Sequence, residues 1–359
     1  MSGIKDVAAK AGVSISTVSN VLNKSKYVSP ELVVRVEAAV KELGYEVNPI
    51  AASMKSKKSG TIGVITEDIC GVFYPYVVKG INAIVDEKGY KTIICDVGGK
   101  KGDVSVMKRE MELFKKLVAS HVDGIIFVSS ISGMQQDKYF VELKKLADNK
   151  NRKIPIVSLE RDLTNIGIDS VYFDGYMNAQ KAVKHLIDCG CKKICHISGS
   201  SELMIAKERQ EGYKKCLREY NMDIDADKMI VYGDYTHQSG YLAMETLLKN
   251  VPDLDGVFCS NDQMAIGALK VLKEHGKNVP EEVKLIGYDD VFVSSIVEPP
   301  ISTIHIQKKT AGKKAAEILF DRIENGASDL AIGVKLESRI VIRRSTQDGV
   351  EEDWDLNEW

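Results

Sequence analysis

The chain has 359 residues, of which 44% are hydrophobic and 28% are charged, and its formal net charge at pH 7 is −2. This length predicts roughly two or three folding units of a globular protein. No apolar run reaches the ~18 residues of a membrane helix, and no signal-peptide segment opens the chain, so we expect a cytoplasmic protein. The seven cysteines, an odd number, favour reduced thiols over a disulfide framework.

The charge is unevenly distributed along the chain. Residues 1–60 carry nine Lys/Arg and five Asp/Glu, a net charge of +4, whereas residues 348–359 carry six acids and no base. A basic head on a nearly neutral body is typical of a phosphate-binding module joined to another domain. The acidic tail, residues 347–359, contains Trp354 and Trp359. We expect this tail to be solvated and disordered, with docking on the body or on a partner as the alternative.

Three short helices are predicted in residues 1–46. Apolar residues recur at helical spacing in residues 4–11, and Gly12 can adopt the left-handed conformation that ends a helix. Ser14 is placed to cap a second helix that runs to residue 23, and Ser29-Pro30 marks the start of a third helix that runs to residue 43. Two helices separated by a short turn with a glycine form the helix–turn–helix pattern of DNA-binding proteins.

The second helix is expected to expose Ile15, Ser16, Thr17 and Asn20 near its N-terminus. In a helix–turn–helix, residues at these positions face base edges in the major groove. Asn pairs with adenine, hydroxyl groups bond several acceptors, and Ile contacts a thymine methyl group. A small polar helix packed on a neutral scaffold is the alternative interpretation of this pattern.

The stretch IKDVAAKAGVSISTVSNVLN, followed by ELGY at 42–45 and NP at 48–49, closely resembles the lactose-repressor/galactose-repressor family of bacterial regulators. The resemblance implies that Ile15, Ser16 and Asn20 read bases. It also implies that Asn23 and Tyr45 contact the phosphate backbone. The partner it implies is double-stranded palindromic operator DNA, whose two half-sites are read by the two heads of a homodimer.

The linker, residues 47–60, is predicted to contain a short hinge helix that starts at Asn48-Pro49. A helix of under ~12 residues is marginal in water, so a flexible basic linker is the alternative. The family resemblance implies that hinge helices fold when two subunits meet over the operator and insert an apolar wedge into the minor groove. Met54 stands at the wedge position, and Lys55 follows it as in the family.

Residues 61–346 alternate apolar strands with amphipathic helices, which predicts an α/β body of parallel sheets with helices on both faces. The predicted strands are 61–65, 91–97, 123–129 and 154–160 in a first set, 192–199, 228–234, 255–261 and 283–289 in a second, and later strands within 296–307 and 335–346. Two sets predict two lobes, and the body resembles the periplasmic sugar-binding proteins. We expect lobe 1 to contain residues 61–160 and 291–321, and lobe 2 to contain residues 161–290 and 322–346.

Ligands of such sheets bind at the carboxyl ends of the strands, so the cleft between the lobes is the predicted effector site. The candidate residues that follow strand ends are Phe73, Tyr74, Glu160, Arg161, Arg209, Tyr235, Asn261, Asp262 and Asp289. Aromatic faces combined with carboxylate, amide and guanidinium groups suit a small polyhydroxylated ring. Each residue also has a structural alternative: Asp262 could cap a helix, and Tyr235 could belong to the core.

The resemblance implies effector contacts at Arg209, Tyr235 and Asp262 and at the aromatic pair. Leu203 and Ile205 stand where the purine-responsive member of the family has polar residues, which argues against a purine-like effector.

The sequence therefore predicts a homodimeric repressor whose operator affinity is controlled by a sugar-like effector. No nucleophile motif points to an enzyme, and no cofactor or metal is implied. Two other functions are retained as alternatives. One is a global regulator controlled by a phosphorylated carrier protein. The other is a solute-binding protein, for which a basic DNA-binding head is unexpected.

Overall fold

The computed structural model describes residues 3–23, 26–45, 58–98, 104–131, 136–149, 152–326 and 330–350. The chain divides into two compact units, Met1–Ser59 and Gly60–Trp359. Most of the predicted hinge, including Met54 and Lys55, and the end of the acidic tail lie outside the described residues. None of the described helices is long and apolar enough to cross a membrane.

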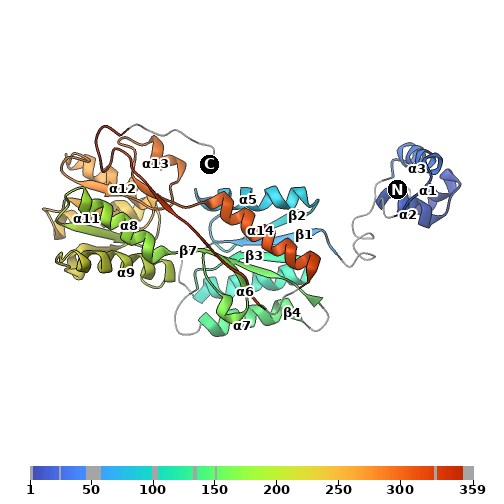
Figure 1. The fold of residues 1–359 in the computed structure, drawn as a ribbon, viewed down its shortest axis with the longest axis horizontal. Coiled ribbons are helices and arrows are strands. Elements are labelled where there is room, and N and C mark those ends of the chain that lie inside the picture. The colour runs from blue at the N-terminus through green and yellow to red at the C-terminus, as the bar shows by residue number, and fades with distance from the viewer. Residues whose placement is uncertain are drawn as a thin grey trace. The chain divides into compact units, whose positions relative to one another are not determined.

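The first unit consists of the three helices that the sequence predicts: α1 (Ile4–Ala11), α2 (Ile15–Asn23) and α3 (Pro30–Leu43) (Figure 1). Gly12 and Gly44 follow α1 and α3 with φ of 63° and 56°, the left-handed conformation that glycine adopts without a steric cost. The Ser14 hydroxyl accepts a hydrogen bond from the Thr17 amide at 3.0 Å, so the predicted cap of α2 is present. The small apolar side chains between the three helices are Val7, Ala8, Ala11, Val18, Val36 and Ala39.

The first sheet of the body has six parallel strands in the order β13-β7-β6-β3-β1-β2. The strands are β1 (Thr61–Thr66), β2 (Lys91–Asp96), β3 (Gly124–Val128), β6 (Ile156–Leu159), β7 (Asp169–Phe173) and β13 (Gly333–Leu336). Two helices pack on one face, α5 (Tyr74–Glu87) and α14 (Lys308–Asn325), and they lie side by side (Figure 1). Two others, α6 (Val104–Ala119) and α7 (Gln136–Ala147), cover the opposite face.

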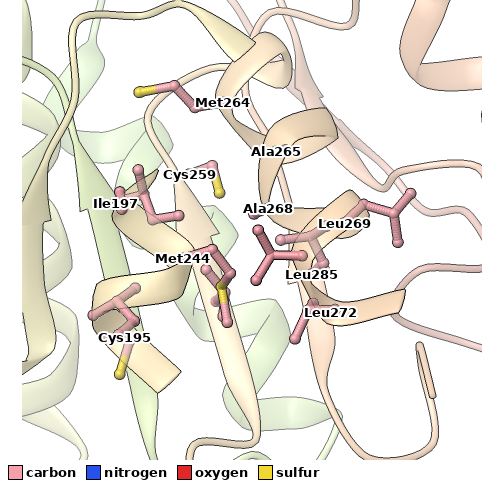
Figure 2. Close-up of a cluster of buried hydrophobic side chains, with 14 of the residues drawn as sticks. Cys195, Ile197, Met244, Cys259, Met264, Ala265, Ala268, Leu269, Leu272 and Leu285 are labelled. Carbon is pink, nitrogen blue, oxygen red and sulfur yellow. The ribbon is translucent and has the colours of Figure 1, made fainter. Parts of the chain in front are cut away.

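The second sheet has four parallel strands in the order β11-β10-β8-β9. The strands are β8 (Ile194–Ser198), β9 (Ile230–Tyr232), β10 (Gly256–Cys259) and β11 (Lys284–Ile286). One face is covered by α8 (Gly175–Asp188) and α9 (Met204–Glu219), and the other by α11 (His237–Asn250) and α12 (Asp262–Glu274). Figure 2 shows the second of these interfaces, where Met264, Ala268 and Leu272 of α12 lie close to the strands. The predicted fold class, a helical head and a two-lobed α/β body, is confirmed.

The remaining described elements are short. They are β4 (Asp148–Asn149), β5 (Arg152–Lys153), a 3₁₀ turn at Thr164–Ile166, α10 (Ala226–Met229), α13 (Phe292–Ile296), β12 (Thr303–His305) and β14 (Arg339–Val341). Of these, β12 and β14 pair antiparallel, and residues 302 and 305 also bridge to residues 286 and 289 beside the second sheet.

The lobe limits expected from the sequence need correction. The first lobe extends to Phe173, because β7 pairs with β6 in the first sheet. The chain returns to this lobe at α14 and β13, and β13 pairs with β7. The segment that contains β12 belongs with the second lobe, since Ile304 packs in the core of that lobe. The first lobe is therefore residues 61–173 and 308–336, and the second is residues 175–306 and 339–346. Apolar periodicity reveals a strand, but it does not reveal which sheet the strand joins.

Candidate DNA-binding surface and ligand cleft

The N-terminal end of α2 carries a compact set of hydroxyl groups. The Ser14 Oγ lies 2.8 Å from both the Ser16 Oγ and the Thr17 Oγ1. Ile15, the next residue to Ser14, leaves 45% of its surface exposed although it is a large apolar side chain. Asn20, one turn further along the helix, is half-buried. This surface offers hydroxyl and apolar groups of the kind that read base edges and thymine methyl groups.

Two further head residues were expected to contact phosphates. Asn23 is the last residue of α2, and its side chain lies outside the described atoms. Tyr45 follows α3 and packs against the core of the head, so its ring has a structural role as well. Sequence reasoning missed Arg35 of α3, whose guanidinium donates to the Ala11 carbonyl at 2.6 Å. This hydrogen bond ties α3 to the turn that sets the orientation of α2.

The body contains a cleft of about 760 Å³ that is lined by residues from both lobes. Seven of the nine predicted effector residues line it: Phe73, Tyr74, Glu160, Arg209, Tyr235, Asn261 and Asp289. The lining also contains polar residues that were not predicted: Glu67, Asp68, Asp96, Ser200, Ser201, Asp234, Thr236 and Gln263. These residues also follow the ends of strands, so a stricter use of the strand-end rule finds them.

The backbone of the cleft is strained at several lining residues. Among the described residues, six that are not glycine have positive φ, and three of these line the cleft. They are Glu160, Tyr235 and Asp289, with φ of 68°, 71° and 106°. Strained backbone of this kind concentrates at ligand-binding sites, where the surrounding structure holds a side chain in a required direction.

The first-lobe wall of the cleft combines an aromatic pair with a carboxylate. The rings of Phe73 and Tyr74 meet edge to face with centroids 5.2 Å apart. The Tyr74 hydroxyl donates to Glu160 at 3.1 Å. Burial and the nearby Glu160 carboxylate raise the pKa of Tyr74, so the phenol stays protonated and continues to donate.

The second-lobe wall is organised around Arg209. Its guanidinium lies 3.7 Å from the centroid of the Tyr288 ring and donates to the Ser260 carbonyl. One of its nitrogens is 4.0 Å from the Asp289 carboxylate. Beside it, the Asn261 amide donates to the Tyr235 carbonyl at 2.9 Å. The carbonyl oxygen of the same Asn261 side chain accepts from the Met264 amide, so Asn261, and not Asp262, caps α12.

Two predicted effector residues do not line the cleft. Asp262 is fully buried, where it accepts hydrogen bonds from the Val291 amide at 2.8 Å and the Thr303 hydroxyl at 2.7 Å. Burial, reinforced by the nearby Asp289, raises the pKa of Asp262 to about 8. Arg161 lines a separate hollow of about 300 Å³, and its guanidinium donates to the Ile131 carbonyl. A strand-end position does not reveal on which side of the strand a side chain lies.

A buried ammonium group ties the cleft to the crossing segments between the lobes. Lys308, the first residue of α14, is 3% exposed. Its Nζ donates to the carbonyls of Asp289 at 2.6 Å, Asp290 at 2.9 Å and Ile306 at 3.3 Å. The carboxylate of Asp290 bonds His305 at 2.7 Å and Arg343 at 2.6 Å. Asp289, which faces the cleft, thus lies in a turn of the second lobe that is bonded to Lys308 at the start of α14 in the first lobe.

A helix–turn–helix unit and a two-lobed body with a ligand-sized cleft together define a ligand-responsive DNA-binding regulator. Residues 3–48 match the family described as bacterial regulatory proteins, lacI family, and residues 183–346 match a periplasmic binding protein-like domain. The chain is 30% identical to the HTH-type transcriptional repressor PurR of Vibrio campbellii (strain ATCC BAA-1116), over 97% of this chain and 99% of PurR. The chain belongs to the lacI family and is a DNA-binding transcriptional regulator.

Two solved structures support the same assignment over nearly the whole chain. The transcriptional regulator CelR–cellobiose complex is 30% identical with a TM-score of 0.68, and the match covers 96% of this chain and 100% of that one. The lac repressor dimer bound to operator and the anti-inducer ONPF is 26% identical with a TM-score of 0.83, and the match covers 96% and 99% of the two chains.

Proposed function

We propose that this regulator is a homodimeric repressor whose affinity for a palindromic operator is controlled by a sugar or sugar derivative bound in the cleft. The observation that carries the proposal is the lining of the cleft, which combines aromatic rings with many hydrogen-bonding side chains from both lobes. The CelR structure, a complex with cellobiose, and the lac repressor structure, a dimer on operator, support the two halves of the proposal.

In this proposal the head reads the operator through Ile15, Ser16, Thr17 and Asn20. Asn23 and Tyr45 contact the phosphate backbone, which fixes the register of the head on the duplex. Met54 and Lys55, which lie outside the described residues, have the roles expected from the sequence: Met54 inserts into the minor groove and Lys55 contacts DNA beside it.

The effector acts by contacting both lobes at once. Tyr74 and Glu160 come from the first lobe, whereas Arg209, Asn261 and Asp289 come from the second. A ligand that contacts both walls stabilises one angle between the lobes over the others and so shifts a population that already exists. By linkage, effector and operator change each other's affinity by the same factor.

Dimerisation is supported by the edge of the first sheet. Strand β2 ends the strand order, and two consecutive residues, Ile93 and Ile94, are 40% and 42% exposed. Consecutive side chains of a strand point to opposite faces, so both faces of this edge are apolar. An apolar edge strand favours association with another chain, and a second copy of this chain is the partner proposed.

The alternative functions have less support. The relative and structures reported above are regulators, which argues against a transport protein or an enzyme. Leu203 and Ile205 line the cleft with apolar side chains that cannot hydrogen-bond to the edge of a nucleobase, so a purine-like effector is disfavoured. Among the described residues, no surface feature identified above favours a phosphorylated carrier protein as the partner.

The test is selection of operator sites from random DNA by the full-length protein, followed by fluorescence anisotropy with and without sugars. We expect an inverted repeat, and we expect its dissociation constant to change when an effector sugar is added. An Asn20→Ala variant should lose discrimination at one base pair of each half-site, at a cost of about 1–3 kcal/mol. A non-palindromic site of monomer size would contradict the dimeric model.

A further inference from the structure

The described lining of the cleft carries many more negative than positive side chains. Six of its lining residues carry a carboxylate, and they come from both lobes: Glu67, Asp68, Asp96, Glu160, Asp234 and Asp289. Among the lining residues that the structure describes, Arg209 is the one that carries a positive charge. A concave site lined by charges of one sign focuses their field, so the described lining makes the cavity electronegative.

The positive charge of Arg209 is already engaged. Its guanidinium is held against the Tyr288 ring, donates to the Ser260 carbonyl and faces the Asp289 carboxylate at 4.0 Å. The ammonium of Lys308, which lies 5.9 Å from the Phe73 ring, is held by the backbone carbonyls of Asp289 and Asp290. A bound anion therefore meets several carboxylates and would have to compete with protein groups for Arg209 and Lys308, the two cations considered among the described residues.

The hydrogen-bonding groups of the cleft also disfavour an anionic ligand. An ionised carboxylate only accepts, and its two oxygens offer about four acceptor sites. Backbone amides use part of this capacity, since Asp96 accepts from Ile69 at 3.2 Å and from Gly98 at 2.9 Å. Hydrogen bonds from Thr236 and Ser239 outweigh the effect of burial and lower the pKa of Asp234, which keeps this carboxylate ionised. A ligand complementary to this surface has to supply donors.

The size of the cleft sets a second requirement. Its volume of about 760 Å³ is in the upper part of the range of small-molecule sites, roughly 300–1,000 Å³. Aromatic residues stand on both walls, with Phe73 and Tyr74 in the first lobe and Tyr232 and Tyr235 in the second. Apolar ring faces and hydroxyl donors occur together in carbohydrates, and the volume accommodates more than one sugar ring.

We propose that the effector is an oligosaccharide of two or more rings that is neutral or carries an ammonium group, and that the cleft excludes sugar phosphates, aldonates and uronates. The proposal rests on the proposed function, because it specifies the ligand of the same site. It assigns the exclusion to the cleft carboxylates, with Glu67 and Asp68 at the end of β1 as the pair that can be neutralised without altering Arg209 or its contacts.

The test uses the full-length protein in calorimetric titrations with disaccharides grouped in matched sets. Each set contains a neutral disaccharide such as cellobiose, its aldonate, and an amino-sugar counterpart such as the disaccharide of glucosamine; glucose 6-phosphate is included as a phosphorylated sugar. Within a set that binds, we expect the anionic member to bind at least about 100-fold more weakly than the neutral one. The ammonium-bearing member should bind at least as tightly as the neutral one. An anionic member within about tenfold of its neutral counterpart, or tight binding of glucose 6-phosphate, would overturn the proposal.

A double variant, Glu67→Gln with Asp68→Asn, tests the assignment to these carboxylates. It should narrow the affinity gap between neutral and anionic members by at least about tenfold. Asp223→Asn removes the same kind of charge from an exposed residue outside the cleft lining and should leave the gap unchanged. Thermal unfolding of each variant without ligand checks that it is folded. An unchanged gap in the double variant contradicts the assignment.

The outcomes separate this inference from the function on which it rests. Binding of anionic sugars with a change in operator affinity would refute the charge selection and retain a sugar-controlled repressor. No binding by any sugar, neutral or charged, would refute the proposed effector class and this inference together.

Discussion

Replacing Lys308 by Met is expected to destabilise the two-lobed body. The side chain is 3% exposed, and its ammonium donates to the carbonyls of Asp289, Asp290 and Ile306. Asp289 and Asp290 have φ of 106° and 55°, so the turn that they form is strained and depends on this donor to hold it. Met has a similar length and fills the same space, but it cannot donate.

The magnitude follows from the two shorter bonds, at 2.6 and 2.9 Å. A buried carbonyl that loses its donor costs about 1–3 kcal/mol, so two of them cost roughly 2–6 kcal/mol. Removal of a buried ammonium recovers part of this loss, because the charge no longer has to be taken out of water. We therefore expect the free energy of unfolding to fall by about 2–4 kcal/mol.

Urea denaturation followed by far-ultraviolet circular dichroism measures this change. Lys313→Met is the matched control, because Lys313 is an exposed residue of the same helix, and its effect should stay within about 0.5 kcal/mol. A loss below about 1 kcal/mol for Lys308→Met, or equal losses in the two variants, would refute the reasoning.

Three further predictions concern buried ionisable groups and the head. Burial lowers the pKa of His196 to about 3, so below pH ~6.5 this residue should lower the free energy of unfolding by about 1.4 kcal/mol per pH unit. His196→Phe should remove this contribution, so the difference in unfolding free energy between variant and wild type should change with that slope between pH ~6.5 and ~5 and stay constant from pH ~7.5 to ~6.5. Burial raises the pKa of Glu110 to about 8, so the contribution of this residue to the free energy of unfolding falls as pH rises from about 4.5 to 8. The free energy of unfolding of Glu110→Gln, relative to that of wild type, should therefore increase over this pH range. A difference that does not change with pH would contradict this prediction. Arg35→Ala removes the hydrogen bond to the Ala11 carbonyl and should lower the free energy of unfolding of the head by about 1–2 kcal/mol. It should also weaken operator binding in anisotropy titrations. Glu37→Ala, on the exposed surface of the same helix, should have neither effect.

The head could be predicted from the sequence almost to the residue. Its helix limits depend on local signals, namely the glycines after α1 and α3, the Ser14 cap and the proline that starts α3. Such signals act within a few residues, so they can be read without knowledge of the tertiary structure. The contact of Arg35 with the turn after α1 joins residues far apart in the chain, and no local pattern reveals it.

The body shows where local patterns stop being sufficient. Buried apolar runs revealed most strands of both sheets, but β7, a five-residue strand that starts with Asp169 and Ser170, was missed. The buried carboxylate of Asp169 is compensated by a bidentate ion pair with Arg322 of α14, at 2.8 and 2.9 Å. Ser170 is bonded by the nearby backbone of Leu163 and Ile168, so the polar half of the strand is buried without apolar side chains. Only three apolar residues remain in β7, too few for a clear strand pattern, and the missed strand displaced the predicted limits of the lobes.

The sequence by itself determined the family, the helix–turn–helix and the existence of a cleft at the strand ends, because these depend on residue order and on short-range periodicity. The tertiary structure decided which side chains reach that cleft. Asp262 and Asn261 are neighbours in the sequence, yet one is fully buried and the other lines the cavity. The excess of carboxylates over cations among the described lining residues is likewise a property of the assembled cleft, since it arises where strand ends from two lobes meet.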